Sequence, residues 1–393
     1  MPQAAKQLNP DLSARDKFGA ELRRWRQTRG LSQAVLARLV HVSPDLVAKV
    51  EKAQRWPTAR LVSRWDEVLD AGGALSELWP AVAAQRDQDA GRPYVDPELP
   101  DHWTRMLRVL AVADNAVGVH GLASVVAKEI KIIERHRGTV RGPTYIQLGR
   151  VQARWLEFAS WVSDNECHPS RAAAELRQAG TLADRVGDTV LFGYVTMRRA
   201  QRALEARRPA IATALVAPLT TDTRLPARVR VLCLVRQAQA QALSGDERSA
   251  QRSLAFAYRH LDRAHHDDED STLAGHCTTM YVHAHEAYCR LLLGDASAAV
   301  DGYHAVLTKW PDDQRLDEGL FRAQLALAND AAGELEAADA EGLIALALAR
   351  QTGSQRTLAM LAVLAERLAG EPRSPSSTQF LGAWRAARAE GAS

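Results

Sequence analysis

The segment from Asp101 to about Gly370 most strongly limits what this chain can fold into, because it is a succession of helix-length runs. Ala, Leu and Arg dominate it, and no stretch shows the alternation of a half-buried strand. The runs span about 15 to 20 residues and end near 138–143, 187, 245, 294, 311, 333, 353 and 370, mostly at glycine or proline. Helices of this length between short breaks predict antiparallel pairs that stack on one another, and therefore an all-α fold.

One of these pairs, AYCRLLLGDASAAVDGYHAVLTKWP at 287–311, carries a more specific pattern. Its offsets resemble those of the tetratricopeptide repeat at Ala287, Gly294, Asp295, Ala299, Tyr303 and Pro311. Gly245 and Gly333 begin partial copies, at spacings of 49 and 39 residues to Gly294 rather than 34. The resemblance implies a tetratricopeptide-like α-solenoid of about five or six pairs over 101–370. A generic helical array without a ligand groove is the alternative.

The remaining segments differ from this region in composition. Residues 1–14 are expected to be a mobile tail, and 15–80 to fold as a compact domain of five helices, the first from Phe18 to Gly30. Residues 81–100 combine polar residues with one glycine and three prolines, which is typical of a linker. Residues 371–393 are expected to form a C-terminal capping helix or a tail.

Positive charge is concentrated near the N-terminus. The whole chain has 50 basic and 47 acidic residues, and 43 of the basic ones are Arg, a bias that suggests GC-rich coding rather than nucleic-acid binding. Residues 15–60, however, hold 11 basic against four acidic residues. A local excess of this kind favours contact with a polyanion.

The segment LSQAVLARLVHVSPDLVAKVEKAQRWPT at 31–58 predicts two short helices around a tight turn. Ser32 can cap the first helix, Ser43 followed by Pro44 can cap the second, and Ala37 is small enough for a close crossing. The segment resembles the helix-turn-helix of the Cro/repressor-like (XRE) family at Leu31, Ser32, Gln33, Leu36, Ala37, Val42, Ser43, Val47, Val50, Glu51 and Pro57. A domain of this family joined to a long helical-repeat region is similar to actinobacterial regulators, and in layout alone to the peptide-sensing quorum regulators of Gram-positive bacteria.

The resemblance implies which side chains would meet double-stranded DNA. Pro44, Asp45 and Lys49 take the positions that face base edges, where Lys49 can donate to guanine and Asp45 can accept from cytosine. An acid in a first helical turn also favours the helix dipole, so a purely structural role for Asp45 stays open. The positions of the backbone clamps hold Gln33, Lys52 and Arg55. Further arginines could contact phosphate or only solvate a helix face: Arg23, Arg24, Arg26 and Arg29.

Two positions depart from the family pattern. His41 stands at a turn position often occupied by glycine, and histidine is among the residues that tolerate a left-handed backbone. Ala53 stands where the family often has a glycine after the third helix. If Ala53 needs a positive φ, the substitution costs about 1 kcal/mol.

Other kinds of site are less well supported. His285 and Cys289 are four residues apart within a cluster of histidines, acids and cysteines from His260 to Cys289, but no second ligand pair has a metal-site spacing. The aromatics of Arg154–Trp161 indicate core packing, with a ligand platform as the alternative. No nucleotide-binding loop, nucleophile elbow or catalytic carboxylate pair is recognisable, so we expect no enzyme, cofactor or metal. The four cysteines are expected to be free thiols.

These observations predict a sequence-specific transcriptional regulator that binds DNA as a homodimer. Its solenoid would bind an effector, with a peptide, a small metabolite and another protein as candidates. No stretch approaches the roughly 20 apolar residues of a membrane span, and a cytoplasmic location is expected. The alternative is a protein-interaction scaffold whose helix-turn-helix has lost DNA readout.

Overall fold

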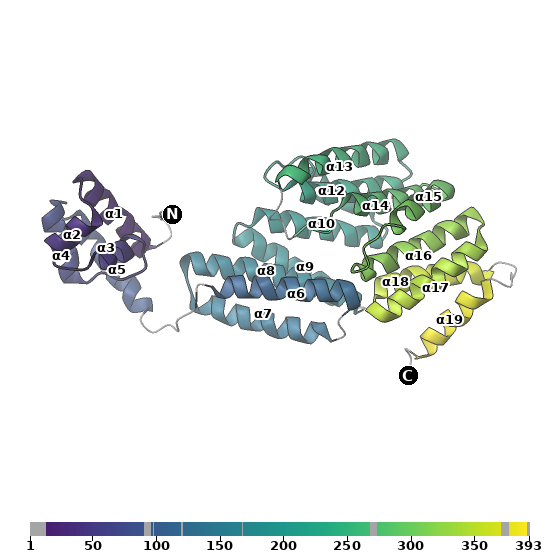
Figure 1. The fold of residues 1–393 in the computed structure, drawn as a ribbon, viewed down its shortest axis with the longest axis horizontal. Helices are drawn as coiled ribbons and strands as arrows, with labels where there is room; N and C mark the ends of the chain where they lie inside the picture. Colours follow the sequence, from purple (N-terminus) through teal and green to yellow (C-terminus); the bar gives the residue numbers. More distant parts are fainter. Residues whose placement is uncertain are drawn as a thin grey trace. The chain divides into compact units, whose positions relative to one another are not determined.

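The structure is a computed structural model that describes residues 13–89, 96, 98–118, 121–166, 168–267, 273–370 and 377–390. It divides into two compact units. The first comprises the chain up to Pro97 with Arg135–Gln147, and the second comprises Glu98–Glu134 and Leu148–Ser393. The described residues form helices and no strands, so the predicted all-α fold, with an N-terminal helix-turn-helix domain and a helical-repeat region, is confirmed (Figure 1). No described helix is long and apolar enough to cross a membrane.

Five helices make up the N-terminal domain. They are α1 (Ala14–Thr28), α2 (Gln33–Leu39), α3 (Pro44–Glu51), α4 (Ala59–Leu69) and α5 (Ala74–Asp89). Their core gathers around the fully buried Trp65, whose ring centroid lies 6.2 Å from that of Phe18. The apolar spacing of Phe18, Leu22 and Trp25 thus serves to turn one face of α1 into this core.

Helix α5 continues past residue 80, where the domain was expected to end, and runs through Pro80 into the predicted linker. Val82 is fully buried in the core, and the Gln85 side chain accepts a hydrogen bond from the Arg15 backbone N–H at 3.1 Å. The segment is mostly polar, but the burial of Val82 and the hydrogen bond of Gln85 stabilise it as a helix. The predicted tail up to residue 12 and the second half of the predicted linker, apart from positions 96 and 98–100, lie outside the described residues.

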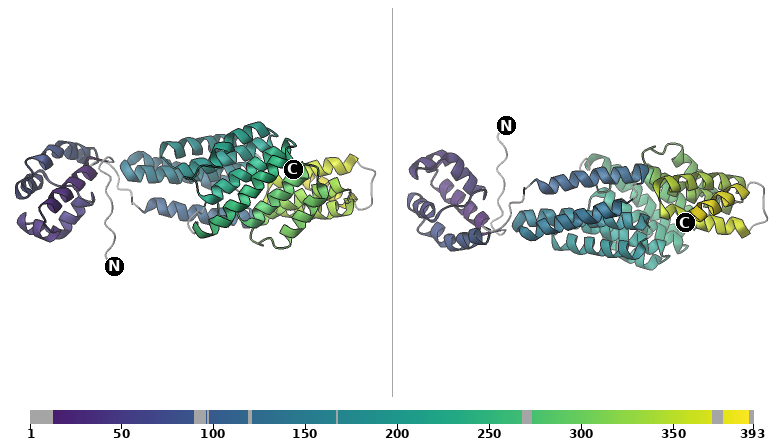
Figure 2. Two further views of the ribbon diagram at one scale, coloured as in Figure 1. Left: turned by 90° about the horizontal axis from the view of Figure 1, so that it is seen from above. Right: turned by 90° about the horizontal axis from the view of Figure 1, so that it is seen from below.

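The remaining helices are antiparallel, and most of them are joined by short turns (Figures 1 and 2). They are α6 (Leu99–Val117), α7 (Leu122–Thr139), α8 (Gly142–Asn165), α9 (Pro169–Arg185), α10 (Thr189–Glu205), α11 (Pro209–Val216), the short 3-10 helix η1 (Ala217–Leu219), α12 (Ala227–Leu243), α13 (Glu247–Asp267), α14 (Thr279–Leu292), α15 (Ala296–Leu307), α16 (Arg315–Ala332), α17 (Leu335–Thr352), α18 (Gln355–Gly370) and α19 (Ser377–Glu390). They belong to the second unit, apart from the end of α7 and the start of α8. Successive helices pack on each other from α9 to α13 and from α14 to α19, which is the arrangement of a helical repeat. Helix α6 packs on α16 and α17, far from it in sequence.

The pattern found at 287–311 corresponds to the pair α14 and α15. Gly294 lies between the two helices with φ +87°, and Gly245 and Gly333 occupy the same place in two other pairs with φ +77° and +81°. The aspartates that follow the first two glycines accept hydrogen bonds from the first turn of the next helix. Small residues stand fully or almost fully buried where the paired helices cross: Ala250, Ala287, Ala299 and Ala338.

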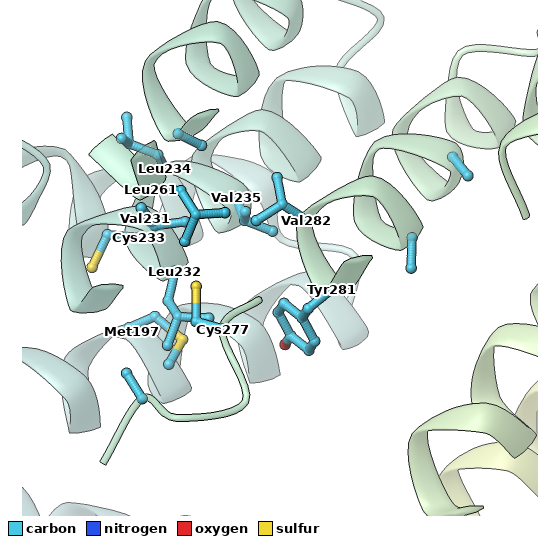
Figure 3. Close-up of a cluster of buried hydrophobic side chains, with 14 of the residues drawn as sticks. Met197, Val231, Leu232, Cys233, Leu234, Val235, Leu261, Cys277, Tyr281 and Val282 are labelled. Carbon is cyan, nitrogen blue, oxygen red and sulfur yellow. The ribbon is translucent and has the colours of Figure 1, made fainter. Parts of the chain in front are cut away.

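Figure 3 shows part of a buried hydrophobic cluster in this unit. It joins α10, α12 and α14 through side chains such as Met197, Leu232 and Val282. Cys233 and Cys277 are buried in it as free thiols, and the buried Cys289 is also free. The fourth cysteine, Cys167, lies outside the described residues.

Candidate functional site

Helices α2 and α3 begin where their capping residues predict. The Ser32 hydroxyl accepts from the Val35 N–H, and the Ser43 hydroxyl accepts from the Leu46 N–H, each at 3.2 Å. Pro44 occupies the first turn of α3, where its missing N–H leaves no bond unmade. His41, in the turn between the helices, has φ +56°, and Ala53, after α3, has φ +55°. Both departures from glycine therefore fall on left-handed residues, as the sequence indicated.

Small residues let the helices of this unit approach closely. Ala37 is fully buried between its neighbours. Gly19 on α1 lies against the backbone of α3, where an added Cβ atom would be only 2.7 Å from the Val50 carbonyl oxygen. Backbone contact of α1 with α3 fixes the position of α3 on the domain.

A buried carboxylate at the end of α3 braces the same arrangement. Glu51 is fully buried, and its two oxygens accept from Arg26 Nε at 2.5 Å and Arg26 Nη2 at 2.9 Å. Gln33 Nε2 donates to Glu51 Oε2 at 2.7 Å, and Arg23 donates to the Glu51 carbonyl oxygen at 2.9 Å. The network ties α1, the start of α2 and the end of α3 together. Its carboxylate belongs to the motif, but nothing in the sequence identified its partners.

Pro44, Asp45 and Lys49, expected to meet base edges, are all exposed on α3. Lys49 Nζ lies 2.8 Å from Asp45 Oδ2, and their side chains are 51% and 68% exposed. The two ionised groups therefore share one helix face and pair with each other, as residues at i and i+4 can.

The three residues expected at phosphates have different surroundings. Gln33 is half-buried and one of its amide N–H groups is used by Glu51, while the second can still donate. Lys52 is half-buried at the C-terminal cap of α3, and Arg55 is exposed just beyond it. All three therefore lie at the ends of α2 and α3.

The four further arginines divide into structural and exposed ones. Arg26 is held by Glu51, and Arg29 donates to the Leu69 carbonyl oxygen at 2.7 Å. Arg23 is bound to Glu51 as described above. Arg24 is exposed and pairs with Glu21 at 2.6 Å. Its guanidinium carbon also lies 4.8 Å from the ring centre of Trp25, so all four arginines make contacts within the domain.

A second candidate site lies in the helical repeats, and the sequence analysis named few of its residues. A cavity of about 520 Å³ is lined by α6 and by the first helix of each pair from α8 to α18. Trp155, from the aromatic run at 154–161, is fully buried, and both Trp155 and the half-buried Trp161 line the cavity. The arginines of the cavity come from five helices, so no local motif could reveal it.

The histidine and cysteine cluster has no metal-binding geometry where the structure describes it. His285 and Cys289 are both buried on α14. No group of three or more His, Cys, Asp or Glu side chains among the described residues is arranged to hold a metal ion. Nothing is described of the side chains from His265 to Asp270.

Comparison with known proteins supports the helix-turn-helix assignment. Residues 17–79 match the family model of the helix-turn-helix domain. Neither the curated proteins nor the solved structures give a match to this chain. The match covers α2, α3 and the helices that brace them, and so residues 17–79 form a helix-turn-helix domain of the kind that binds DNA.

Proposed function

We propose that this protein is a sequence-specific transcriptional regulator of the Cro/repressor-like (XRE) class, which reads DNA with α3. The observation that carries the proposal is the combination of an exposed α3 with a rigid support. Pro44, Asp45 and Lys49 face solvent, while Val47 and Val50 on the same helix are fully buried and Glu51 anchors its end. A helix presented in this way can enter the major groove without rearrangement of the domain.

The pair of Asp45 and Lys49 fits a role in base readout. An exposed ion pair contributes only about 0–1 kcal/mol, so Lys49 can leave Asp45 at little cost and donate to guanine O6 and N7. Asp45 is then free to accept from a cytosine amino group. Because one helix reads only a few base pairs, we propose that the protein binds as a homodimer on two half-sites.

The helical repeats are proposed to be tetratricopeptide-like and to sense an effector in the cytoplasm. The repeated glycine and alanine positions in the pairs α12/α13, α14/α15 and α16/α17 support the first part. The cavity between α6 and the repeats supports the second, because a peptide, a metabolite or part of a protein partner could occupy it. No catalytic activity is proposed.

One observation favours the alternative of an interaction scaffold that no longer reads DNA. In the free protein the strongest donor of α3, Lys49, is neutralised by Asp45 at 2.8 Å, and the Gln33 amide is bound to Glu51 at 2.7 Å. A scaffold would keep both contacts permanently. A protein that reads DNA would exchange the contact of Lys49 with Asp45 for a contact with a base.

Selection of binding sites from a random duplex library by the purified full chain distinguishes the two. The regulator is expected to enrich one sequence, and Lys49→Ala to weaken binding to it by about 1–3 kcal/mol and to relax the preference at one base pair. Arg64→Ala, which removes an exposed positive charge from α4, is the control and is expected to keep that preference. A library that shows no enrichment, or an equal effect of both variants, would favour the scaffold.

A further inference from the structure

The cavity of the helical repeats is a built site with walls from many parts of the unit. One wall is α6, with residues such as Leu107 and Asp114. The others are the first helices of the pairs, with Trp161 on α8, Arg198 on α10, Arg236 on α12 and residues of α14, α16 and α18. Its volume of about 520 Å³ falls in the range of sites that hold small organic molecules, about 300–1,000 Å³.

The charge of the lining is positive. Six arginines line the cavity against four acids, Asp114, Glu157, Asp313 and Asp317. Glu157 lies 3.6 Å from Arg198 Nε, and Asp114 accepts from Trp161 Nε1 at 2.9 Å, so these two carboxylates are already engaged. Burial and, to a smaller extent, the neighbouring Arg236, Arg198 and Arg154 lower the pKa of His276 to about 4.

Hydrogen-bond donors without acceptors lie in the same walls. Arg236 Nη1 donates to Gln239 Oε1 at 2.8 Å, which turns the Gln239 amide nitrogen toward His285 Nδ1 at 3.0 Å. His285 Nδ1 is therefore the acceptor, and its proton is on Nε2. That N–H has no acceptor in the described part of the chain. Arg154 Nη1 and Arg236 Nε likewise have none, and Arg198 Nε has only the Glu157 carboxylate at 3.6 Å, beyond hydrogen-bond distance.

These donors require an explanation because buried polar groups are normally paired. Arg198, Arg236 and His285 are each at least 95% buried. All the unpaired buried atoms of the described lining residues are nitrogens that donate, so a molecule that pairs with them has to offer acceptors. Arginines that line one cavity suit an anionic group best.

Aromatic rings lie beside the arginines. The guanidinium carbons of Arg198 and Arg356 lie 4.7 and 5.4 Å from the ring centre of Trp161. Phe158 and Phe321 also line the cavity, and the Phe321 ring centre lies 5.6 Å from that of His285. The site therefore offers flat apolar surface next to its positive charge, which suits a planar molecule.

We propose that this cavity binds a small organic anion with a planar apolar part, held at its carboxylate or phosphate by Arg154, Arg198 and Arg236. The planar part would lie against Trp161, Phe158 and Phe321. The inference rests on the sensing role proposed above and gives its effector a chemical class. Because α6 forms one wall, the occupied site also holds α6 against the repeats.

Two dyes with the same ring system test the charge requirement on the unmodified full chain. Anilinonaphthalene sulfonate carries an anionic group, and phenylnaphthylamine is its neutral counterpart. We expect one sulfonate dye per chain, bound about tenfold to a hundredfold more tightly than the neutral dye, because charged hydrogen bonds stabilise the anion. Equal or tighter binding of the neutral dye would overturn the proposal.

Competition for the bound dye distinguishes the anionic groups. Naphthoate or naphthyl phosphate is expected to displace the sulfonate dye, and whichever does so identifies the preferred group. Naphthylmethylamine, which has the same rings and a positive charge, is expected to leave the dye bound. Displacement by the amine as readily as by the two anions would contradict the proposal.

A matched pair of variants locates the site. Arg198→Gln removes a buried arginine of the cavity, and Arg199→Gln makes the same change at the next residue, which is exposed. The first is expected to weaken binding of the sulfonate dye by about tenfold or more, and the second to leave it unchanged. Equal effects, with both variants folded by circular dichroism, would place the dye elsewhere and refute the assignment.

DNA binding by the same preparations separates this inference from the proposed function. If the chain enriches a DNA sequence but does not prefer the anionic dye, the proposed ligand class is wrong and the proposed regulator function stands. If the chain binds the anionic dye but enriches no DNA sequence, the proposed ligand site stands and the regulator function is wrong.

Discussion

Replacement of Glu51 by Gln tests how the helix-turn-helix domain holds α3. The substitution keeps the size of the side chain and removes its charge. Arg26, whose side chain is only 11% exposed, would lose the carboxylate that now accepts from Nε and Nη2. The Gln33 amide would also face another amide in place of a carboxylate oxygen.

The size of the effect follows from the burial of this pair. Removal of one partner from a buried ion pair costs about 3–5 kcal/mol, because the remaining charge is left without compensation. A domain of about 65 residues has an unfolding free energy of roughly 3–10 kcal/mol in total. Glu51→Gln is therefore expected to remove about half or more of the stability of the N-terminal domain.

Hydrogen exchange followed by mass spectrometry, at increasing denaturant concentration, measures this loss in the full chain. Peptides from residues 17–79 report the N-terminal domain, and peptides from α12 and α14 report the repeats. Glu67→Gln is the control, because Glu67 is 71% exposed and lies 4.0 Å from Arg64. A loss below about 1 kcal/mol for Glu51→Gln, close to what exposed pairs contribute, would refute the reasoning.

Three further predictions concern the helical repeats. A Cβ atom at Gly118 would lie 1.9 Å from the Thr352 carbonyl oxygen, so Gly118→Ala is expected to loosen α6 from α17 and to speed hydrogen exchange in α6. Gly121→Ala is the control, because Gly121 also has a positive φ but a Cβ atom there would have no neighbouring atom within 4 Å. Equal hydrogen exchange in the two variants would contradict the close contact of Gly118 with Thr352. The pKa of His276 falls from 6.5 to about 4 on folding. Between these pH values the unfolded state therefore binds more protons than the folded state. The unfolding free energy of the repeats is expected to fall as the pH is lowered from about 6.5 to about 4. Denaturation curves at several pH values check this, and a His276→Gln variant that kept the full pH dependence would show that another group causes it. Burial raises the pKa of the Cys233, Cys277 and Cys289 thiols to about 12, so iodoacetamide is expected to label them only after denaturation. Peptide mapping would locate the label, and labelling of these three thiols in the native protein would contradict their burial.

The features predicted correctly from the sequence depend on local chemistry. Ser32, Ser43 and Pro44 start helices because their side chains satisfy or remove the N–H groups of a first turn. His41 and Ala53 have the positive φ that the family pattern implied. The breaks at Gly245, Gly294 and Gly333 lie between helices because glycine adopts the left-handed conformation there.

The features that the sequence did not reveal depend on contacts between distant residues. The polar composition of residues 81–89 indicated a linker, but Val82 and Gln85 hold them as helix through partners in α1 and the core. Arg26 resembled a phosphate contact until its position beside Glu51 was known. The cavity combines Arg154, Arg198 and Arg236 from three separate helices, and their common location follows only from the stacking of the pairs.

The affinity of the full chain for its selected duplex and for a scrambled duplex of the same length, over a series of salt concentrations, tests the central claim most directly. A regulator that reads bases with α3 is expected to bind the selected duplex about a thousandfold or more tightly than the scrambled one at physiological salt. Affinity for both should fall as salt rises, because cations are released from phosphates when Lys and Arg side chains bind. Equal affinity for the two duplexes at every salt concentration would contradict the account.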